Sequence, residues 1–217
     1  WNLSECGKYF VTRNQSAIIA FKVSRKDYSG FHIAASHSDS PTLKIKESSE
    51  MNIENQYVKL NVEKYGGMLC APWFDRPLSV AGRIIVKDGN RLTTKLINVD
   101  RDLLMIPNLA IHMNREVNDG YKYNIQKDML PLYRMSNSGK AFKEMIAEEA
   151  GVSVDQIKGM DLFLYNRMEG TVWGCDGEFI SAPRLDDLQC AFTSTMALLN
   201  SESDRCIPVV AVFDNEE

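Results

Sequence analysis

Near-continuous apolar segments and a helical pattern occur near both ends of the chain, whereas hairpin signals fill its middle, and this division limits the folds that it can adopt. Residues 1–46 and 165–217 carry the first pattern, which is typical of an α/β layer. Residues 47–164 carry the second pattern, which is typical of antiparallel sheets. We therefore predict an α/β domain that is interrupted by an inserted β-rich domain.

The apolar segments near the two ends have the length of strands. Ala17–Val23 and Phe31–Ser36 predict two strands joined as a hairpin by the polar loop Ser24–Gly30, and their apolar character predicts burial on both faces. Ile207–Phe213 predicts the last strand. Leu188–Leu199 has apolar residues at helical spacing and predicts a helix.

The middle of the chain shows the alternation of half-exposed strands. Gln56–Lys64 predicts one antiparallel strand. Arg83–Lys87 and Arg91–Val99 predict a hairpin, with Asp88-Gly89 as its turn signal. Ser138–Ala150 predicts a helix that its first residue caps and that a glycine ends.

The composition excludes several classes of protein. A net charge of −4, from 25 basic and 29 acidic residues, argues against nucleic acid as the main partner. No apolar stretch is long enough to span a bilayer, so we expect no membrane partner. The five cysteines are scattered and form no C-x-x-C pair, which indicates a reducing compartment such as the cytoplasm.

His37 and Asp39 lie two residues apart, just past a predicted strand. In an extended chain this spacing puts both side chains on one face. A neutral imidazole can bind a divalent metal ion, and a carboxylate at its other ring nitrogen fixes the tautomer. The alternative is a polar loop with a surface histidine, and the spacing alone does not separate the two.

Acidic residues precede the predicted helix and follow the last predicted strand. Asp186 can bridge two metal ions, and Asp187 can then cap the helix or support a ligand, although capping alone also explains an aspartate here. Glu216 can take a proton from water while Glu217 binds a metal. These neighbours share a site only if the chain leaves extended geometry after Phe213, and simple exposure at a strand end is the alternative.

Seven sequence segments, spread over nearly the whole chain, match one known protein family. They are Tyr9–Asn14, His37–Lys46, Tyr65–Arg76, Ala81–Arg83, Ile106–His112, Ile180–Asp186 and Phe213–Glu217. Together they resemble the M18 family of metallo-aminopeptidases, the aspartyl aminopeptidases. Because the segments are numerous and keep their order, the resemblance is more specific than any single motif.

The resemblance implies a zinc-exopeptidase-like catalytic domain, with a mixed sheet flanked by helices, interrupted by a β-rich dimerisation domain. It implies two zinc ions per complete active site, with His37, Asp186 and Glu217 as ligands and Asp186 as the bridge. It also implies that Glu216 is the general base and that Asp39 orients His37.

The resemblance further implies an assembly and a longer parent chain. His112, which its apolar neighbours alone would place in a core, would bind substrate in a partner subunit's active site and stabilise the oxyanion there. The family forms homo-oligomers built from dimers, typically dodecamers. In the family the peptide bond after the bridging aspartate, which is Asp186-Asp187 in this chain, is often cis. The family's remaining Asp and His ligands and its specificity residue would lie beyond Glu217, so we expect the parent protein to extend past both ends.

The expected function is a zinc-dependent aminopeptidase that releases N-terminal Asp or Glu from peptides by means of a water activated by two metal ions. Since part of the ligand set is missing from the 217 residues, we expect the fragment alone to be inactive. Two alternatives stay open: a catalytically inactive binding or assembly module, and a related zinc exopeptidase with another N-terminal preference. A co-catalytic deacetylase fits the motifs less well.

Overall fold

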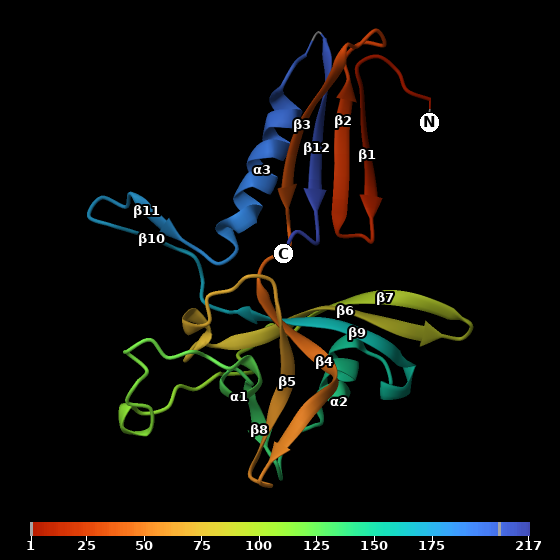
Figure 1. Ribbon diagram of the computed structural model, residues 1–217. Coiled ribbons are helices and arrows are strands. Elements are labelled where there is room, and N and C mark those ends of the chain that lie inside the picture. The colour runs from red at the N-terminus through yellow and green to blue at the C-terminus, as the bar shows by residue number, and fades with distance from the viewer. Residues whose placement is uncertain (1, 204) are drawn as a thin grey trace. The chain divides into compact units, whose positions relative to one another are not determined.

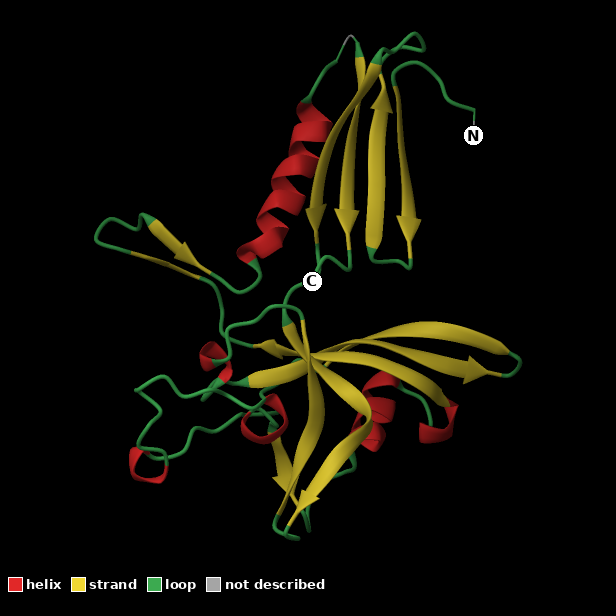
Figure 2. Ribbon diagram, in the orientation of Figure 1, coloured by secondary structure: helices red, strands yellow, loops and turns green. Residues whose placement is uncertain are grey.

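The protein is described by a computed structural model that covers residues 2–203 and 205–217. It forms two compact units (Figures 1 and 2). Unit 1 combines the residues up to Ser40 with Thr171–Glu217, and unit 2 is Pro41–Gly170. No helix in the described part of the chain is long and apolar enough to cross a membrane.

The two units meet at positions 40/41 and 170/171, each six residues from the predicted domain boundaries 46/47 and 164/165. The reason is that single strands run through both predicted boundaries. Thr42–Ile53 is one strand, β4, and Ile157–Asn166 is another, β9, and both belong to the sheet of unit 2. A local change in pattern does not reveal where a continuous strand begins.

Unit 1 consists of a four-stranded mixed sheet, one long helix and a small hairpin. Its elements are β1 (Gly7–Arg13), β2 (Ala17–Val23), β3 (Gly30–His37), β10 (Thr171–Trp173), β11 (Phe179–Ser181), α3 (Leu185–Asn200) and β12 (Cys206–Phe213). The strand order is β1-β2-β12-β3, in which β12 is antiparallel to β2 and parallel to β3.

This order corrects the predicted hairpin between β2 and β3. The two strands are not neighbours, because β12 lies between them and pairs with both. Their predicted burial on both faces is also wrong, since Phe31 and Ile33 in β3 are 56% and 67% exposed. Helix α3 covers one face of the sheet, where Leu198 packs against Val210 and Val212. Among the described residues nothing comparable covers the other face.

Unit 2 consists of a six-stranded antiparallel sheet with short helices. Its elements are β4 (Thr42–Ile53), β5 (Tyr57–Tyr65), β6 (Leu78–Asp88), β7 (Arg91–Asn98), α1 (Ile125–Asp128), β8 (Leu132–Met135), α2 (Phe142–Ala150) and β9 (Ile157–Asn166), with 3-10 turns at Ala71–Trp73, Ile111–Met113 and Val154–Gln156. The strand order is β7-β6-β9-β4-β5-β8. Alternate strand residues and the inner face of α2 form the main core; its fully buried members include Leu43, Leu60, Leu78, Ile84, Phe142, Ile146 and Leu162.

Two details of unit 2 follow directly from local chemistry. Helix α2 begins four residues later than predicted: Glu144 accepts the N–H of Ala141 and Glu50 accepts that of Phe142, so Ser138 is not the cap. In β6, a side chain at Gly82 would put its Cβ 2.2 Å from the backbone oxygen of Asp161 in β9. A glycine there permits close approach of the two strands.

Asp75 fixes the start of the long loop that carries His112. Its carboxylate accepts the backbone N–H of Asn108 at 2.9 Å and the side-chain amide at 2.8 Å, and its own N–H donates to the oxygen of Ile106 at 2.9 Å. The Asn108 backbone and then its amide hold the pKa of Asp75 below its usual value. The carboxylate therefore stabilises this loop in its ionised form.

At pH 7 we expect the free energy of unfolding of the Asp75→Asn variant to be about 1–2 kcal/mol lower than that of the parent. The reason is that an amide has only one acceptor oxygen and turns an N–H towards a donor. Since folding lowers the pKa, this stabilisation is present above the unfolded pKa of about 3.9 and is lost as the pH falls through the folded pKa. Urea unfolding at pH 7 and pH 3 measures it. A difference between variant and parent that is as large at pH 3 as at pH 7 would contradict the assignment.

Candidate metal and catalytic site

The candidate site of unit 1 lies where two parallel strands end side by side. His37 is the last residue of β3 and pairs in register with Phe213, the last residue of β12. Just beyond, the N–H of Ser38 donates to the oxygen of Phe213 at 2.8 Å. Ligands of α/β proteins bind outside the carboxyl ends of parallel strands. The sequence thus brings residues 37–40 and 214–217 to the edge where such a site forms.

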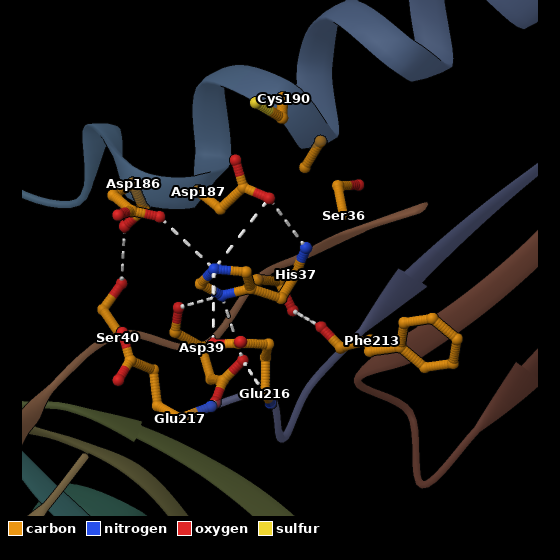
Figure 3. A network of polar contacts seen from close by, with 12 residues as sticks. Ser36, His37, Asp39, Ser40, Asp186, Asp187, Cys190, Phe213, Glu216 and Glu217 are labelled. Atoms are coloured by element: carbon orange, nitrogen blue, oxygen red, sulfur yellow. Dashed lines mark hydrogen bonds and ion pairs between the residues drawn. The ribbon is translucent and has the colours of Figure 1, made fainter. Parts of the chain in front are cut away.

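The imidazole of His37 is held from one side and faces carboxylates on the other (Figure 3). Its Nδ1 lies 3.0 Å from the backbone oxygen of Asp39 and 3.3 Å from Asp39 Oδ1. Because both neighbours are acceptors, the proton of the neutral ring belongs on Nδ1, which leaves the Nε2 lone pair free. Nε2 lies 3.3 Å from Asp186 Oδ1, 3.8 Å from Glu216 Oε2 and 3.9 Å from Asp187 Oδ2.

The electrostatics of His37 reflect this concentration of acidic groups. Burial by itself would lower the pKa of the imidazole, whose side chain is 11% exposed. The hydrogen bond to the Asp39 backbone oxygen and the charges of Asp187, Asp39 and Glu216 outweigh burial and raise the pKa. The site therefore attracts positive charge, as a binding site for a divalent cation does.

Asp39 makes contacts that the sequence interpretation missed. Besides its contact with His37, its nearly buried carboxylate accepts the N–H of Glu216 at 3.2 Å through Oδ1 and that of Glu217 at 3.0 Å through Oδ2. One side chain thus holds the imidazole and the backbone of both glutamates. No local signal marks this role, because Asp39 and Glu216 are 177 residues apart in the chain.

The segment before α3 supplies two aspartates with different surroundings. The peptide bond between Asp186 and Asp187 is cis, as the resemblance implied, and both residues have non-helical dihedral angles, so the regular helix starts at Leu188 as predicted. The Asp186 side chain is 90% exposed and turns Oδ1 towards His37. Ser40 donates its hydroxyl to the backbone oxygen of Asp186 at 3.4 Å.

Asp187 is mostly buried and ties the helix to β3. Its Oδ2 accepts the backbone N–H of His37 at 3.1 Å. The thiol of Cys190 and then this N–H lower the pKa of Asp187, so its carboxylate is ionised. Sequence analysis gave Asp187 two roles, capping of the helix or support of a ligand, and both are represented. The carboxylate accepts the N–H of His37, and it also accepts a hydrogen bond from the backbone of Cys190 in the first turn of the regular helix.

The remaining predicted residues are placed less centrally. Glu217 has its backbone fixed next to Glu216 by the bond to Asp39. His112 lies in unit 2, in the exposed 3-10 turn Ile111–Met113, and not in the core that its apolar neighbours suggested. The structure therefore places Asp39, Asp186 and Glu216 around His37. His112 belongs to the other unit.

The donors at this site are of the type that zinc prefers, namely one imidazole nitrogen and several carboxylate oxygens. The free Nε2 lone pair and the carboxylates around it fit a divalent ion. Over residues 2–203 and 205–217, however, no group of three or more His, Cys, Asp or Glu is arranged to hold a metal ion.

Comparisons with known proteins agree on one family. A family model described as aminopeptidase I zinc metalloprotease (M18) matches residues 1–217. A probable M18 family aminopeptidase 2 of Clostridium acetobutylicum is 48% identical over 226 aligned residues, which cover 100% of this chain and 52% of that protein. A protein of the same name in Pseudomonas aeruginosa is 38% identical with the same coverage.

Solved structures give the same result for the fold. Chaetomium thermophilum mApe1 is 36% identical with a TM-score of 0.87, and the match covers 99% of this chain and 53% of that one. The S. cerevisiae mApe1 dodecamer is 26% identical with a TM-score of 0.78, and the match covers 98% and 50%. The chain spans about half the length of the relatives that it matches.

Proposed function

Because the chain belongs to the M18 family of zinc aminopeptidases, we propose that its parent protein releases N-terminal Asp or Glu from peptides, using two zinc ions in each complete active site. The observation that supports this most directly is the convergence of the His37 Nε2 atom with the carboxylates of Asp186 and Glu216, all within 3.8 Å. The preference for acidic residues follows from the sequence resemblance to aspartyl aminopeptidases.

In this proposal the ligands divide between the two ions. His37 and Glu217 would each hold one ion, and Asp186 would be shared between the two. Zinc, when bound, would polarise the scissile carbonyl and lower the pKa of water towards about 7. The exposure of Asp186 suits a ligand that must reach outward, and the fixed tautomer of His37 suits binding through Nε2.

The chain's own residues then carry the proton transfers. Glu216 accepts the proton of the attacking water on its carboxylate and later gives it to the leaving amine. The hydrogen bond from the Glu216 backbone N–H to the Asp39 carboxylate holds the backbone of this base beside the imidazole. His112, supplied by the inserted domain of a partner subunit, would donate a hydrogen bond to the developing oxyanion.

We further propose that the parent protein acts as a homo-oligomer in the cytoplasm and that unit 2 is its dimerisation domain. A structural relative is described as a dodecamer, and the fold of this chain matches it closely. The loop that carries His112 exposes Leu109, Ile111 and Met113, which suits insertion into a neighbouring subunit. The five cysteines are free thiols, as expected in a reducing compartment.

A substrate panel on the full-length protein tests the proposed function. After removal of metal with a chelator, we expect activity to return with two zinc ions per subunit. We expect kcat/KM for N-terminal Asp and Glu to exceed that for Leu, Ala and Lys by at least about tenfold. Preference for Leu or Lys would favour a zinc exopeptidase of different specificity. No hydrolysis of any substrate at saturating zinc would favour the assembly module.

We expect the 217-residue chain alone to be inactive on the same substrates. The physical reason is that its described residues do not form a ready metal cluster, and that ligands shared between two ions bind a pair weakly when the set is incomplete. Calorimetric titration measures the zinc affinity of the chain, and hydrolysis of an Asp-chromophore substrate measures its activity. Turnover by this chain at a rate near that of the full-length protein would refute the expectation.

A further inference from the structure

The sheet of unit 2 ends in a strand whose outer edge is open. β7 is the first strand of the order β7-β6-β9-β4-β5-β8, and no strand from the described part of the chain pairs with its outer side (Figure 1). β7 has eight residues, whereas β8 at the opposite edge has four. Long open edges are usually protected by charges, prolines or bulges, because they are templates for pairing with another chain.

The backbone groups on the open edge belong to alternate residues of β7. The hairpin of β6 and β7 turns through the two residues Gly89-Asn90, so the flanking pair Asp88 and Arg91 is hydrogen-bonded. Hydrogen-bonded and non-bonded pairs alternate along an antiparallel ladder. The N–H and C=O groups of Leu92, Thr94 and Leu96 therefore point away from β6, towards the open edge.

The side chains of these three residues form an uncharged, largely apolar row. Leu92 and Leu96 are 66% and 81% exposed, and they lie with Thr94 on one face of the strand. Lys95 projects from the opposite face, where its amine donates to the backbone oxygen of Ala150 at 2.9 Å. The one lysine of the strand is thus engaged within the subunit.

We propose that β7 pairs antiparallel with β7 of a second copy of this chain, around a two-fold axis at Thr94. In this register Leu92 lies opposite Leu96 of the partner subunit, and Leu96 lies opposite Leu92 of the partner subunit. The two sheets join into one, the leucines of each pair contact each other, and the outward backbone groups of both strands become paired.

The charges of the strand select this register. With Thr94 on the axis, Lys95 lies opposite Thr93 of the partner subunit and Arg91 lies opposite Ile97 of the partner subunit, so no like charges face each other. A shift of the axis to residue 93 would oppose Arg91 and Lys95, and a shift to residue 95 would oppose two Lys95 side chains. Like charges directly opposite each other destabilise a sheet.

This interface gives the dimerisation assigned to unit 2 a defined surface and involves no zinc ligand. An experiment that disproves this interface would therefore leave the proposed function untouched, and the reverse also holds. The proposal needs only the open edge and the pairing register, and both can be tested by measuring association without substrate or metal.

Paired charge substitutions in the 217-residue chain test the proposal by sedimentation velocity. We expect a dimer whose dissociation constant rises at least about tenfold in Leu92→Glu and in Leu96→Glu, because each change places a charge against an apolar partner. We expect Leu92→Glu/Leu96→Lys to return to within about threefold of the parent, because opposite charges then face each other across the axis. The two substituted positions are four residues apart on one strand, so they do not pair within a subunit.

The matched control is Leu69→Glu, since Leu69 is 80% exposed in unit 2 but lies outside the sheet. A Thr94→Cys variant gives a second readout, because a residue on the axis can form a disulfide with itself in the partner under mild oxidation. We expect peptide mapping to find the bond between the two copies of position 94. A monomeric parent, an equal effect of Leu69→Glu, no recovery in the double variant or no such disulfide would overturn the proposal.

Discussion

Replacing Glu216 by glutamine in the full-length protein is expected to lower kcat by about 10²–10⁴-fold, the range that a positioned general base contributes. Glutamine keeps the size of the side chain and its reach towards Nε2 of His37, which the Glu216 carboxylate approaches to 3.8 Å. It removes the ability to accept a proton. Because Glu216 is not a metal ligand in the proposed site, we expect the zinc content and KM to change little.

The control for this experiment is Glu202→Gln, which changes an exposed glutamate of unit 1 outside the site. Metal analysis by mass spectrometry and steady-state kinetics on an Asp substrate give the comparison. If Glu216→Gln keeps more than about a tenth of the parent kcat, Glu216 is not the base. If the variant instead loses one zinc ion, the roles of Glu216 and Glu217 must be exchanged.

Some of the strands and helices could be predicted from the sequence, because their signals are local, whereas β1, β4, β8, β10, β11 and α1 were not predicted. β2 coincides with the predicted Ala17–Val23, and the regular part of α3 begins at the predicted Leu188. The hairpin of β6 and β7 was also found, although its turn is centred on Gly89-Asn90 and not on Asp88-Gly89. Alternation, helical spacing and turn residues determine such elements without help from the rest of the chain.

The neighbours of β2 and β3 could not be predicted, because the strand between them comes from the other end of the chain. β12 begins at Cys206, and nothing in Ser24–Gly30 announces that the strands on either side are separated. Burial failed for a related reason. The apolar residues of β3 were read as buried on both faces, whereas α3 covers only one face of the sheet in the described structure.

The site shows the same division between residue type and geometry. The sequence indicated which side chains have the chemistry of a metal site, and the structure places His37, Asp186 and Glu216 together. Only the register of β3 with β12 brings Asp39 under the backbone of the glutamate pair. A motif of two residues can suggest a partner for a histidine, but it contains no information about contacts made across 177 residues.

Replacing Asp39 by asparagine is expected to lower kcat by about 10²-fold and to weaken zinc binding by about 10–100-fold in the full-length protein. In the structure the carboxylate accepts the backbone N–H groups of Glu216 and Glu217, and its Oδ1 lies 3.3 Å from Nδ1 of the His37 ring. Asparagine offers one acceptor oxygen and turns its NH₂ group towards a donor. The base, one proposed ligand and the imidazole should therefore all lose their alignment.

The matched control is Asp214→Asn, which changes a carboxylate of the same segment that accepts the hydroxyl of Ser16 and makes no bond to the glutamate pair. Zinc titration, kcat on an Asp substrate and the unfolding midpoint should be measured for both variants. If Asp39 positions the site, zinc affinity and kcat fall together in Asp39→Asn and stay near the parent values in Asp214→Asn. Equal losses in both variants, in proportion to their lowered unfolding midpoints, would show that Asp39 only stabilises the fold, because a positioning residue must affect the site beyond its effect on stability.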